Sequence, residues 1–109
     1  MALTVESADG QLTTTSYADV IAAPAANRER IVRNVIFHNA GVAAIGITLA
    51  KKHDSDYRVI WDWNKIIIPP KETLIFDDVV NLTDTDHSLR AKLSGAGTVD
   101  FTAAYVEKS

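Results

Sequence analysis

The sequence contains no cysteine. This absence excludes disulfide bonds, thiolate metal sites and cysteine nucleophiles. No apolar run approaches the roughly 20 residues that a membrane-spanning helix needs. The segment MALTVESADG also lacks the basic start and the apolar core of a secretory signal peptide. We therefore expect a protein that is made in the cytoplasm and has no membrane partner.

Motifs for phosphate binding and hydrolysis are missing as well. The SGAG segment at 94–97 is followed by an alternating apolar run, and it has neither the lysine nor the helix start of a phosphate-binding loop. The sequence has no Gly-x-Ser-x-Gly and no His-Glu-x-x-His segment. Its net charge of −3 gives no general attraction to nucleic acid. We expect a chain that is not an enzyme, needs no cofactor and binds no nucleic acid.

Composition predicts one globular domain over residues 1–109. Apolar residues make up 47% of the chain and charged residues 23%, which are ordinary values for a folded domain. A chain of this length buries about two-thirds of the surface that its unfolded form exposes. The sequence can therefore support one modest core.

Apolar and polar residues alternate along most of the chain, as in strands with one buried face. In TVDFTAAYVEK the expected inner face consists of Val99, Phe101, Ala103 and Tyr105. In YRVIWDWN the expected shared face consists of Tyr57, Val59, Trp61 and Trp63. In RIVRNVIFHN the expected shared face consists of Ile31, Arg33, Val35 and Phe37. Turn-forming segments separate these runs at intervals of roughly 10 to 15 residues. The pattern predicts an all-β antiparallel sandwich, jelly-roll or immunoglobulin-like, with about eight strands.

The first 25 or so residues are richer in Thr and Ser and have only scattered large apolar side chains. The Asp9-Gly10 pair can support a tight hairpin turn. Residues 1–25 therefore form either a first hairpin or strand of the sandwich, or an N-terminal arm that orders against a neighbour.

The segment KIIIPPKETLIF sets three isoleucines against two prolines. We expect Ile66, Ile67 and Ile68 to form a short strand covered on both faces, at a corner between sheets or at a subunit contact. The prolines then end the strand because neither can donate a backbone hydrogen bond. TLIF at 73–76 begins the next strand.

Candidate metal or catalytic residues are few. His38, His53 and His87 are far apart in sequence, and we expect each at a strand end or loop, without a shared metal. The acidic segments HDSD and DTDH offer oxygen ligands for calcium, but neither continues into a calcium-binding loop, so turn capping is the simpler interpretation. Arg28, Arg30 and Arg33 form the one basic cluster, which we interpret as an ion-pairing surface and not a phosphate track.

The two tryptophans allow a second interpretation. Trp61 and Trp63, with Tyr57, could form a flat aromatic platform that stacks on sugars, or they could fill the core or a subunit interface. We favour the core or the interface, because the chain has only two tryptophans and the apolar Val59 lies between Tyr57 and Trp61. Arg58 and Asp62 roughly cancel in charge, which argues against stacking of single-stranded nucleic acid on these rings.

The body of the chain, about residues 28–108, resembles the small β-sandwich virion proteins of tailed bacteriophages, most of all capsid decoration (cement) proteins. The resemblance rests on the Asn-Ala-Gly turn after a strand, the Pro-x-Glu-Thr corner, the Leu-Arg-Ala strand after an acidic turn and the closing Thr-Val-Asp strand. It implies a non-enzymatic capsid-surface protein that bridges and stabilises capsid subunits, with a homotrimer and the major capsid protein as partners. A neck or tail ring component and a carbohydrate-binding module using Trp61 and Trp63 are the alternatives. The candidate interface residues are Trp61, Trp63, Ile66, Ile67, Ile68, Pro69 and Pro70.

Overall fold

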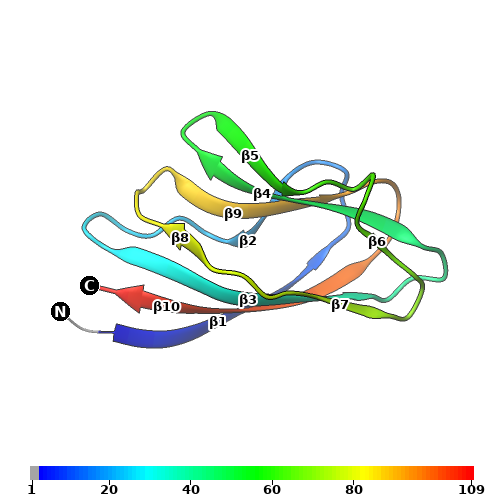
Figure 1. Cartoon of the computed structure of the whole chain (residues 1–109), viewed down its shortest axis with the longest axis horizontal. Coiled ribbons are helices and arrows are strands. Elements are labelled where there is room, and N and C mark those ends of the chain that lie inside the picture. The colour runs from blue at the N-terminus through cyan, green and yellow to red at the C-terminus, as the bar shows by residue number, and fades with distance from the viewer. Residues whose placement is uncertain (1–2) are drawn as a thin grey trace.

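A computed structural model describes residues 3–109, which form strands, turns and loops and no helix (Figure 1). The strands are β1 (Leu3–Leu12), β2 (Ala18–Ile21), β3 (Glu29–Asn39), β4 (Ile45–His53), β5 (Asp56–Trp61), β6 (Ile67–Ile68), β7 (Thr73–Phe76), β8 (Val80–Leu82), β9 (His87–Leu93) and β10 (Val99–Lys108). The all-β prediction is confirmed, with ten strands in place of about eight. Within these residues no helix is long and apolar enough to cross a membrane.

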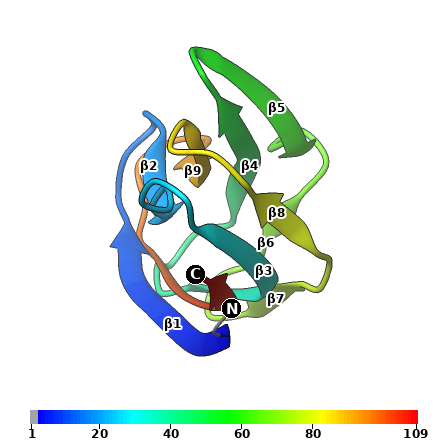
Figure 2. The ribbon, with the colours of Figure 1, turned by 90° about the vertical axis from the view of Figure 1, so that its left-hand side faces the viewer.

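The strands form two antiparallel sheets that face each other as layers, as Figure 2 shows from the end of the molecule. The first sheet has the order β1-β10-β3-β7, with β8 also paired to β3. The second has the order β2-β9-β4-β5, with β6 also paired to β4. The predicted antiparallel β-sandwich is therefore the observed architecture.

The core lies between the two sheets and is built from alternate residues of the long strands. Its largest fully buried apolar side chains are Phe37, Leu12, Ile21, Ile47, Leu49, Ile68, Leu82, Leu89, Val32, Val35 and Val99. Burying one such side chain contributes about 1.5–3 kcal/mol. The alternation of β10 is as predicted, because Val99, Phe101 and Ala103 are buried and Tyr105 packs against the core.

The predicted face of β3 is wrong for part of the strand. The register between β3 and β10 shifts by one residue at Arg33, which therefore has no partner on β10. Such a β-bulge changes which residues point inward. Val32 joins Val35 and Phe37 in the core, while Ile31 faces outward and is half-buried.

The N-terminal segment contributes a strand of the first sheet. β1 pairs with β10 along its whole length and passes straight through Asp9 and Gly10, so the hairpin turn expected there does not form. Gly10 lies against the ring of Phe101, where a Cβ atom would come within 2.6 Å of Cζ. A glycine at this point lets the two strands pack closely. Residues 1–2 of the expected arm lie outside the described residues.

Asn39 ties the turn after β3 to the Pro-Pro corner. Its side chain is 1% exposed. Its Nδ2 donates hydrogen bonds to the carbonyl oxygens of Ala43 (2.9 Å) and Ile68 (3.0 Å), and its Oδ1 accepts one from the Gly41 amide (2.9 Å). Its own carbonyl accepts from the Lys71 amide. The Asn-Ala-Gly turn and the Pro-Pro corner are thus held by one buried amide.

Candidate functional site

The main candidate site is an exposed apolar surface along one edge of the second sheet. Its residues are Tyr57, Val59, Ile60, Trp63 and Ile67, and we call it the β5–β6 apolar surface. All five are large apolar side chains at least 36% exposed, with Val59 at 55% and Ile67 at 57%. β5 and β6 both lie on the side of β4 that faces away from β9. Gly46 accepts a hydrogen bond from Ser94, which follows β9, whereas the next residue, Ile47, donates its amide to Ile66 on the other side. Contiguous exposed apolar residues of this kind mark protein contacts or ligand sites.

A β-bulge decides which β5 residues belong to this surface. Leu49 pairs with Trp61 and Ala50 pairs with Val59, so Ile60 has no partner on β4. Val59 therefore faces outward while Trp61 faces the core. The prediction that Tyr57, Val59, Trp61 and Trp63 share one face is wrong for this reason.

The two tryptophans have different environments. The Trp61 ring lies 5.8 Å from Phe37 and 5.2 Å from Phe76, centroid to centroid, and packs against the core. Trp63 is 44% exposed, and its amide donates to Thr48 Oγ1 at 3.3 Å. Because Trp61 is inside, the structure does not form an aromatic platform from both tryptophans.

Gly46 allows the segment with Trp63 to cross β4. A Cβ atom on Gly46 would lie 2.8 Å from the Trp63 carbonyl oxygen and 3.2 Å from the Ser94 Cβ. Gly46 also donates its amide to Ser94 Oγ at 2.9 Å. Because Gly46 has no side chain, residues 62–66 can pack directly on β4. The Trp63 ring remains at the surface.

The three isoleucines are not covered on both faces as expected. Ile68 is 1% exposed and lies in the core, Ile66 is half-buried, and Ile67 points outward. Pro69 and Pro70 are exposed. Among the predicted interface residues, the structure leaves Trp63, Ile67 and the two prolines open to a partner and places Trp61 and Ile68 inside. That the open residues contact a partner stays a prediction.

The outer face of the second sheet carries a stacked tyrosine pair beside the apolar surface. Tyr17 and Tyr57 stack at 4.0 Å with 8° between the ring planes, and Lys92 Nζ lies 4.6 Å from the Tyr17 centroid. Burial raises the pKa of Tyr17, with smaller contributions from Tyr57 and Asp62. Arg90 donates to the Tyr57 hydroxyl at 3.1 Å. These contacts hold Tyr57 in place and cover one face of each tyrosine ring.

A second apolar area lies on the outer face of the first sheet. Val5, Val106 and Ile31 form one row across β1, β10 and β3. Ile36 and Ile75 form another row across β3 and β7. Val5 is 81% and Ile75 56% exposed. We call these five residues the β3 outer surface. The two sheets thus each present apolar side chains away from the shared core.

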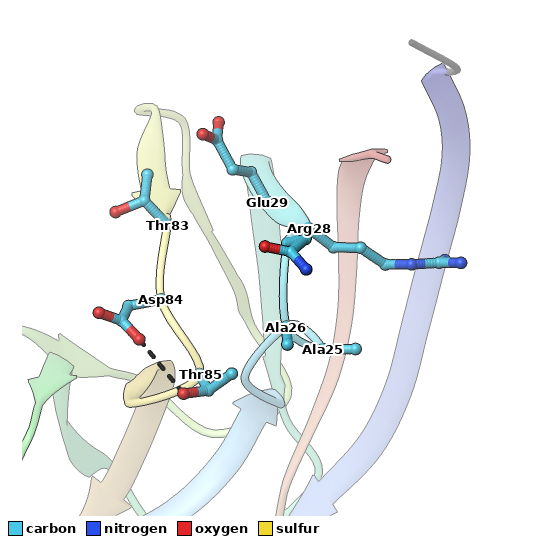
Figure 3. Close-up of a pocket in the computed structure, with 8 residues that line it drawn as sticks. Ala25, Ala26, Arg28, Glu29, Thr83, Asp84 and Thr85 are labelled. Atoms are coloured by element: carbon cyan, nitrogen blue, oxygen red, sulfur yellow. Dashed lines mark hydrogen bonds between the residues drawn. The ribbon is translucent and has the colours of Figure 1, made fainter.

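An open pocket lies between residues 25–29 and residues 83–85 (Figure 3). Its volume is about 510 Å³. Thr85 donates to Asp84 Oδ1, and hydrogen bonds from Thr85 lower the pKa of that carboxyl. Arg28 points from this region toward β10. Within residues 3–109 no group of three or more His, Cys, Asp or Glu side chains could hold a metal ion.

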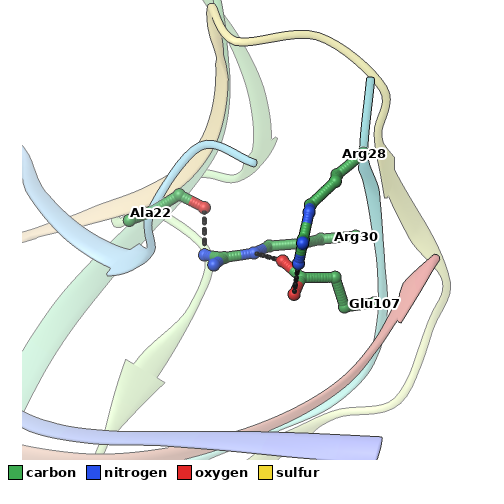
Figure 4. Close-up of polar contacts among 4 residues, drawn as sticks. All are labelled: Ala22, Arg28, Arg30 and Glu107. Atoms are coloured by element: carbon green, nitrogen blue, oxygen red, sulfur yellow. Dashed lines mark hydrogen bonds and ion pairs between the residues drawn. The ribbon is translucent and has the colours of Figure 1, made fainter. Parts of the chain in front are cut away.

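The basic cluster forms ion pairs, as predicted. Arg28 and Arg30 both bind the Glu107 carboxylate, at 3.3 Å and 2.9 Å (Figure 4). Arg30 also donates to the Ala22 carbonyl at 2.9 Å. The hydrogen bond from Arg30 is the main cause that lowers the pKa of Glu107. Arg33 lies at the bulge of β3, away from this cluster and exposed.

Two of the three histidines meet, which the sequence did not indicate. His53 and His87 are direct partners in the β4–β9 register, and the HDSD and DTDH turns therefore lie together. His38 is separate and contacts Thr73 Oγ1 through Nδ1 at 2.9 Å. In the sequence, the one hint that these two histidines could lie close together was the similar composition of the HDSD and DTDH turns.

Comparison with known proteins supports the fold class alone. No family model and no curated protein matches the sequence. The crystal structure of PirA is similar with a TM-score of 0.52 and 15% identity, covering 92% of both chains. A de novo designed double-stranded β-helix has a TM-score of 0.33 and 9% identity, covering 92% of this chain and 97% of that chain.

A chain from the infectious bursal disease virus structure has a TM-score of 0.35 and 11% identity, covering 97% of this chain and 31% of that chain. Only the likeness to PirA, with its TM-score of 0.52, indicates a shared fold, and at 15% identity it says nothing about activity.

Proposed function

We propose that this chain is a non-enzymatic structural protein of a virus particle. In this proposal it is a capsid decoration protein of the tailed-bacteriophage type, which associates with itself, as a trimer, and bridges copies of the major capsid protein. The observation that carries the proposal is the presence of the β5–β6 apolar surface and the β3 outer surface on opposite sheets. A protein that joins copies of itself to a shell needs two such contact areas.

The β5–β6 apolar surface is assigned to self-association in this proposal. It contains Trp63 and Ile67, and the exposed prolines lie next to it along the chain. Large aromatic and aliphatic side chains that become fully buried dominate the energetics of protein interfaces. The β3 outer surface then remains for the shell. Binding only to the assembled shell shifts the assembly equilibrium toward the intact particle.

Self-association is tested by sedimentation equilibrium of the wild type, Trp63→Lys and Ile67→Lys. Val42→Lys is the matched control, because Val42 is 90% exposed and lies in the turn after β3, outside both surfaces. We expect the wild type and the control to form trimers, and the two surface variants to shift to monomer while keeping the wild-type circular dichroism spectrum.

Capsid binding is tested by adding the wild type and Ile75→Lys to empty shells of a phage that encodes the chain. We expect the wild type to cosediment and to raise the temperature at which the shells open, and the variant to do neither. A wild type that is monomeric at 100 µM and does not cosediment with shells overturns the proposal. A six-fold or twelve-fold ring by native mass spectrometry supports the neck or tail alternative instead.

A further inference from the structure

The contact between His53 and His87 closes one end of the second sheet. The two residues form the last pair of the β4–β9 ladder. Their ring centroids are 4.5 Å apart, and His53 Nδ1 lies 2.5 Å from His87 Nε2. His87 is 7% exposed, whereas the His53 side chain is 36% exposed. A buried ring thus contacts a ring that water can reach.

Each histidine begins or ends an acidic turn, so the contact joins two loops. His53 precedes the β4–β5 turn, in which Asp54 has a positive φ of 57°. His87 follows the β8–β9 connection, which carries Asp86. A hydrogen bond between the carboxyl groups of Asp86 and Asp54 raises the pKa of Asp86. The two loops are therefore linked by the histidine pair, while the carboxyl groups of Asp54 and Asp86 share a hydrogen bond only when one of them is protonated.

Hydrogen bonding fixes which nitrogen of His87 carries the proton. The Thr83 amide donates to His87 Nδ1 at 3.3 Å, so Nδ1 is an acceptor. The neutral ring then has its proton on Nε2, which donates it to His53 Nδ1. One proton lies between two nitrogens in this arrangement. His87 Nε2 has no free lone pair for a metal ion in this tautomer.

A second proton removes this hydrogen bond. When both rings are charged, both facing nitrogens carry hydrogen atoms and two positive charges lie side by side. Lys51 of β4 adds a third positive charge. Asp54 of the β4–β5 turn and Asp84 of the β8–β9 connection oppose it, and Lys52 faces Asp86. Burial first, then Lys51 and His53, lower the pKa of His87.

We propose that the His53–His87 pair is an acid-labile clasp, which joins the β4–β5 turn to the β8–β9 connection at neutral pH and opens in acid. This inference does not depend on the proposed function. The sign follows from the lowered pKa of His87, because its folded form binds fewer protons than its unfolded form. Stability is complete above the ordinary histidine pKa of about 6.5 and falls as the pH drops below it. The carboxyl pair has the opposite sign, since protonation strengthens it.

The clasp also determines how firmly β5 is held in its sheet. In the strand order β2-β9-β4-β5 this strand lies at the edge of its sheet, and β4 is its one neighbour. The turn that precedes it is held at neutral pH by the contact of His53 with His87. Opening of the clasp therefore loosens the strand that carries Tyr57 and Val59.

Hydrogen exchange of the full chain at pH 7.5 and pH 5.0, corrected for intrinsic exchange rates, tests this proposal. We expect protection of residues 50–58 and 83–90 to fall at least tenfold at pH 5.0, while β3 and β10 keep theirs. His53→Gln removes the partner ring at the more exposed position and should weaken the pH dependence, because burial of His87 still lowers its pKa. His38→Gln is the matched control and should behave as the wild type. Asp86→Asn should keep the acid response, because the carboxyl pair opposes it.

Long-range nitrogen-15 NMR spectra of the histidine rings provide an independent readout. We expect His87 at pH 7.5 to be neutral with its proton on Nε2. A proton on Nδ1 at that pH overturns the clasp, and so does equal protection of the two loops at both pH values. An undiminished acid response in His53→Gln would assign the loosening to other groups and also refute the proposal.

Discussion

Asn39→Asp changes one nitrogen to oxygen and tests how far a single buried amide holds the corner of the sandwich together. The native Nδ2 donates to the carbonyl oxygens of Ala43 and Ile68. The introduced carboxyl would place an oxygen against both carbonyls, and the fold offers no water there because the side chain is 1% exposed. The substitution keeps the size and shape of the side chain, so packing is unchanged.

The expected loss follows from the hydrogen bonds. Leaving one buried polar group without its partner costs about 1–3 kcal/mol, which applies to the Ile68 carbonyl, whereas the hydrogen bond to the exposed Ala43 is only part-buried and its loss costs less. This loss is a substantial part of the roughly 5–15 kcal/mol by which domains of this size are stable. Protonation restores one donor. The pKa of the introduced carboxyl is raised in the folded state, so the loss should shrink as the pH falls from 7 to 5.

Urea unfolding followed by tryptophan fluorescence, at pH 7 and pH 5 against wild type at each pH, measures this loss. Asn64→Asp is the control, because Asn64 is exposed and the same chemical change there should stay within about 0.5 kcal/mol. A loss under 1 kcal/mol for Asn39→Asp at pH 7, or one that grows toward pH 5, would refute the reasoning.

Three further predictions concern packing and charge. Trp61→Ala should lower the free energy of unfolding by about 3–5 kcal/mol, whereas Trp63→Ala should lower that of the monomer far less, since only the first ring packs in the core. Gly46→Ala should cost about 1–3 kcal/mol in urea unfolding, because its Cβ meets the Trp63 main chain; an unchanged midpoint would show that residues 62–66 do not lie on β4. Glu107→Gln should lower the melting temperature at pH 7 and lose this effect at low pH. The lowered pKa of Glu107 means that its contribution is present above the ordinary value and disappears as the pH falls through the folded value. A constant difference across pH 3–7 would contradict the pairing with Arg30.

Alternation predicted the strands well where pairing is regular. In β10 the expected inner residues are the observed ones, because the strand has one buried face with a period of two. The predicted face was wrong in β3 up to Arg33 and in β5 after Ile60. A bulge adds a single residue, and no residue type in these segments marks the place where the ladder shifts.

The candidate site was predicted in part. Trp63 and Ile67 are exposed apolar residues in the segment chosen from the sequence, whereas Ile68 lies in the core and the half-buried Trp61 packs against it. The meeting of His53 and His87 depends on the register of two strands distant in sequence, which local composition does not determine.

The central position of β10 has a consequence for biosynthesis. β1 and β3 are neighbours of β10 and not of each other, so the first sheet cannot be completed until residues 99–108 have left the ribosome. Until then β1 lacks its partner strand, and β3 can pair only with β7 and β8. Such non-local pairing is slow and exposes apolar surface to other nascent chains. We expect the earlier strands to need chaperone protection until β10 has emerged.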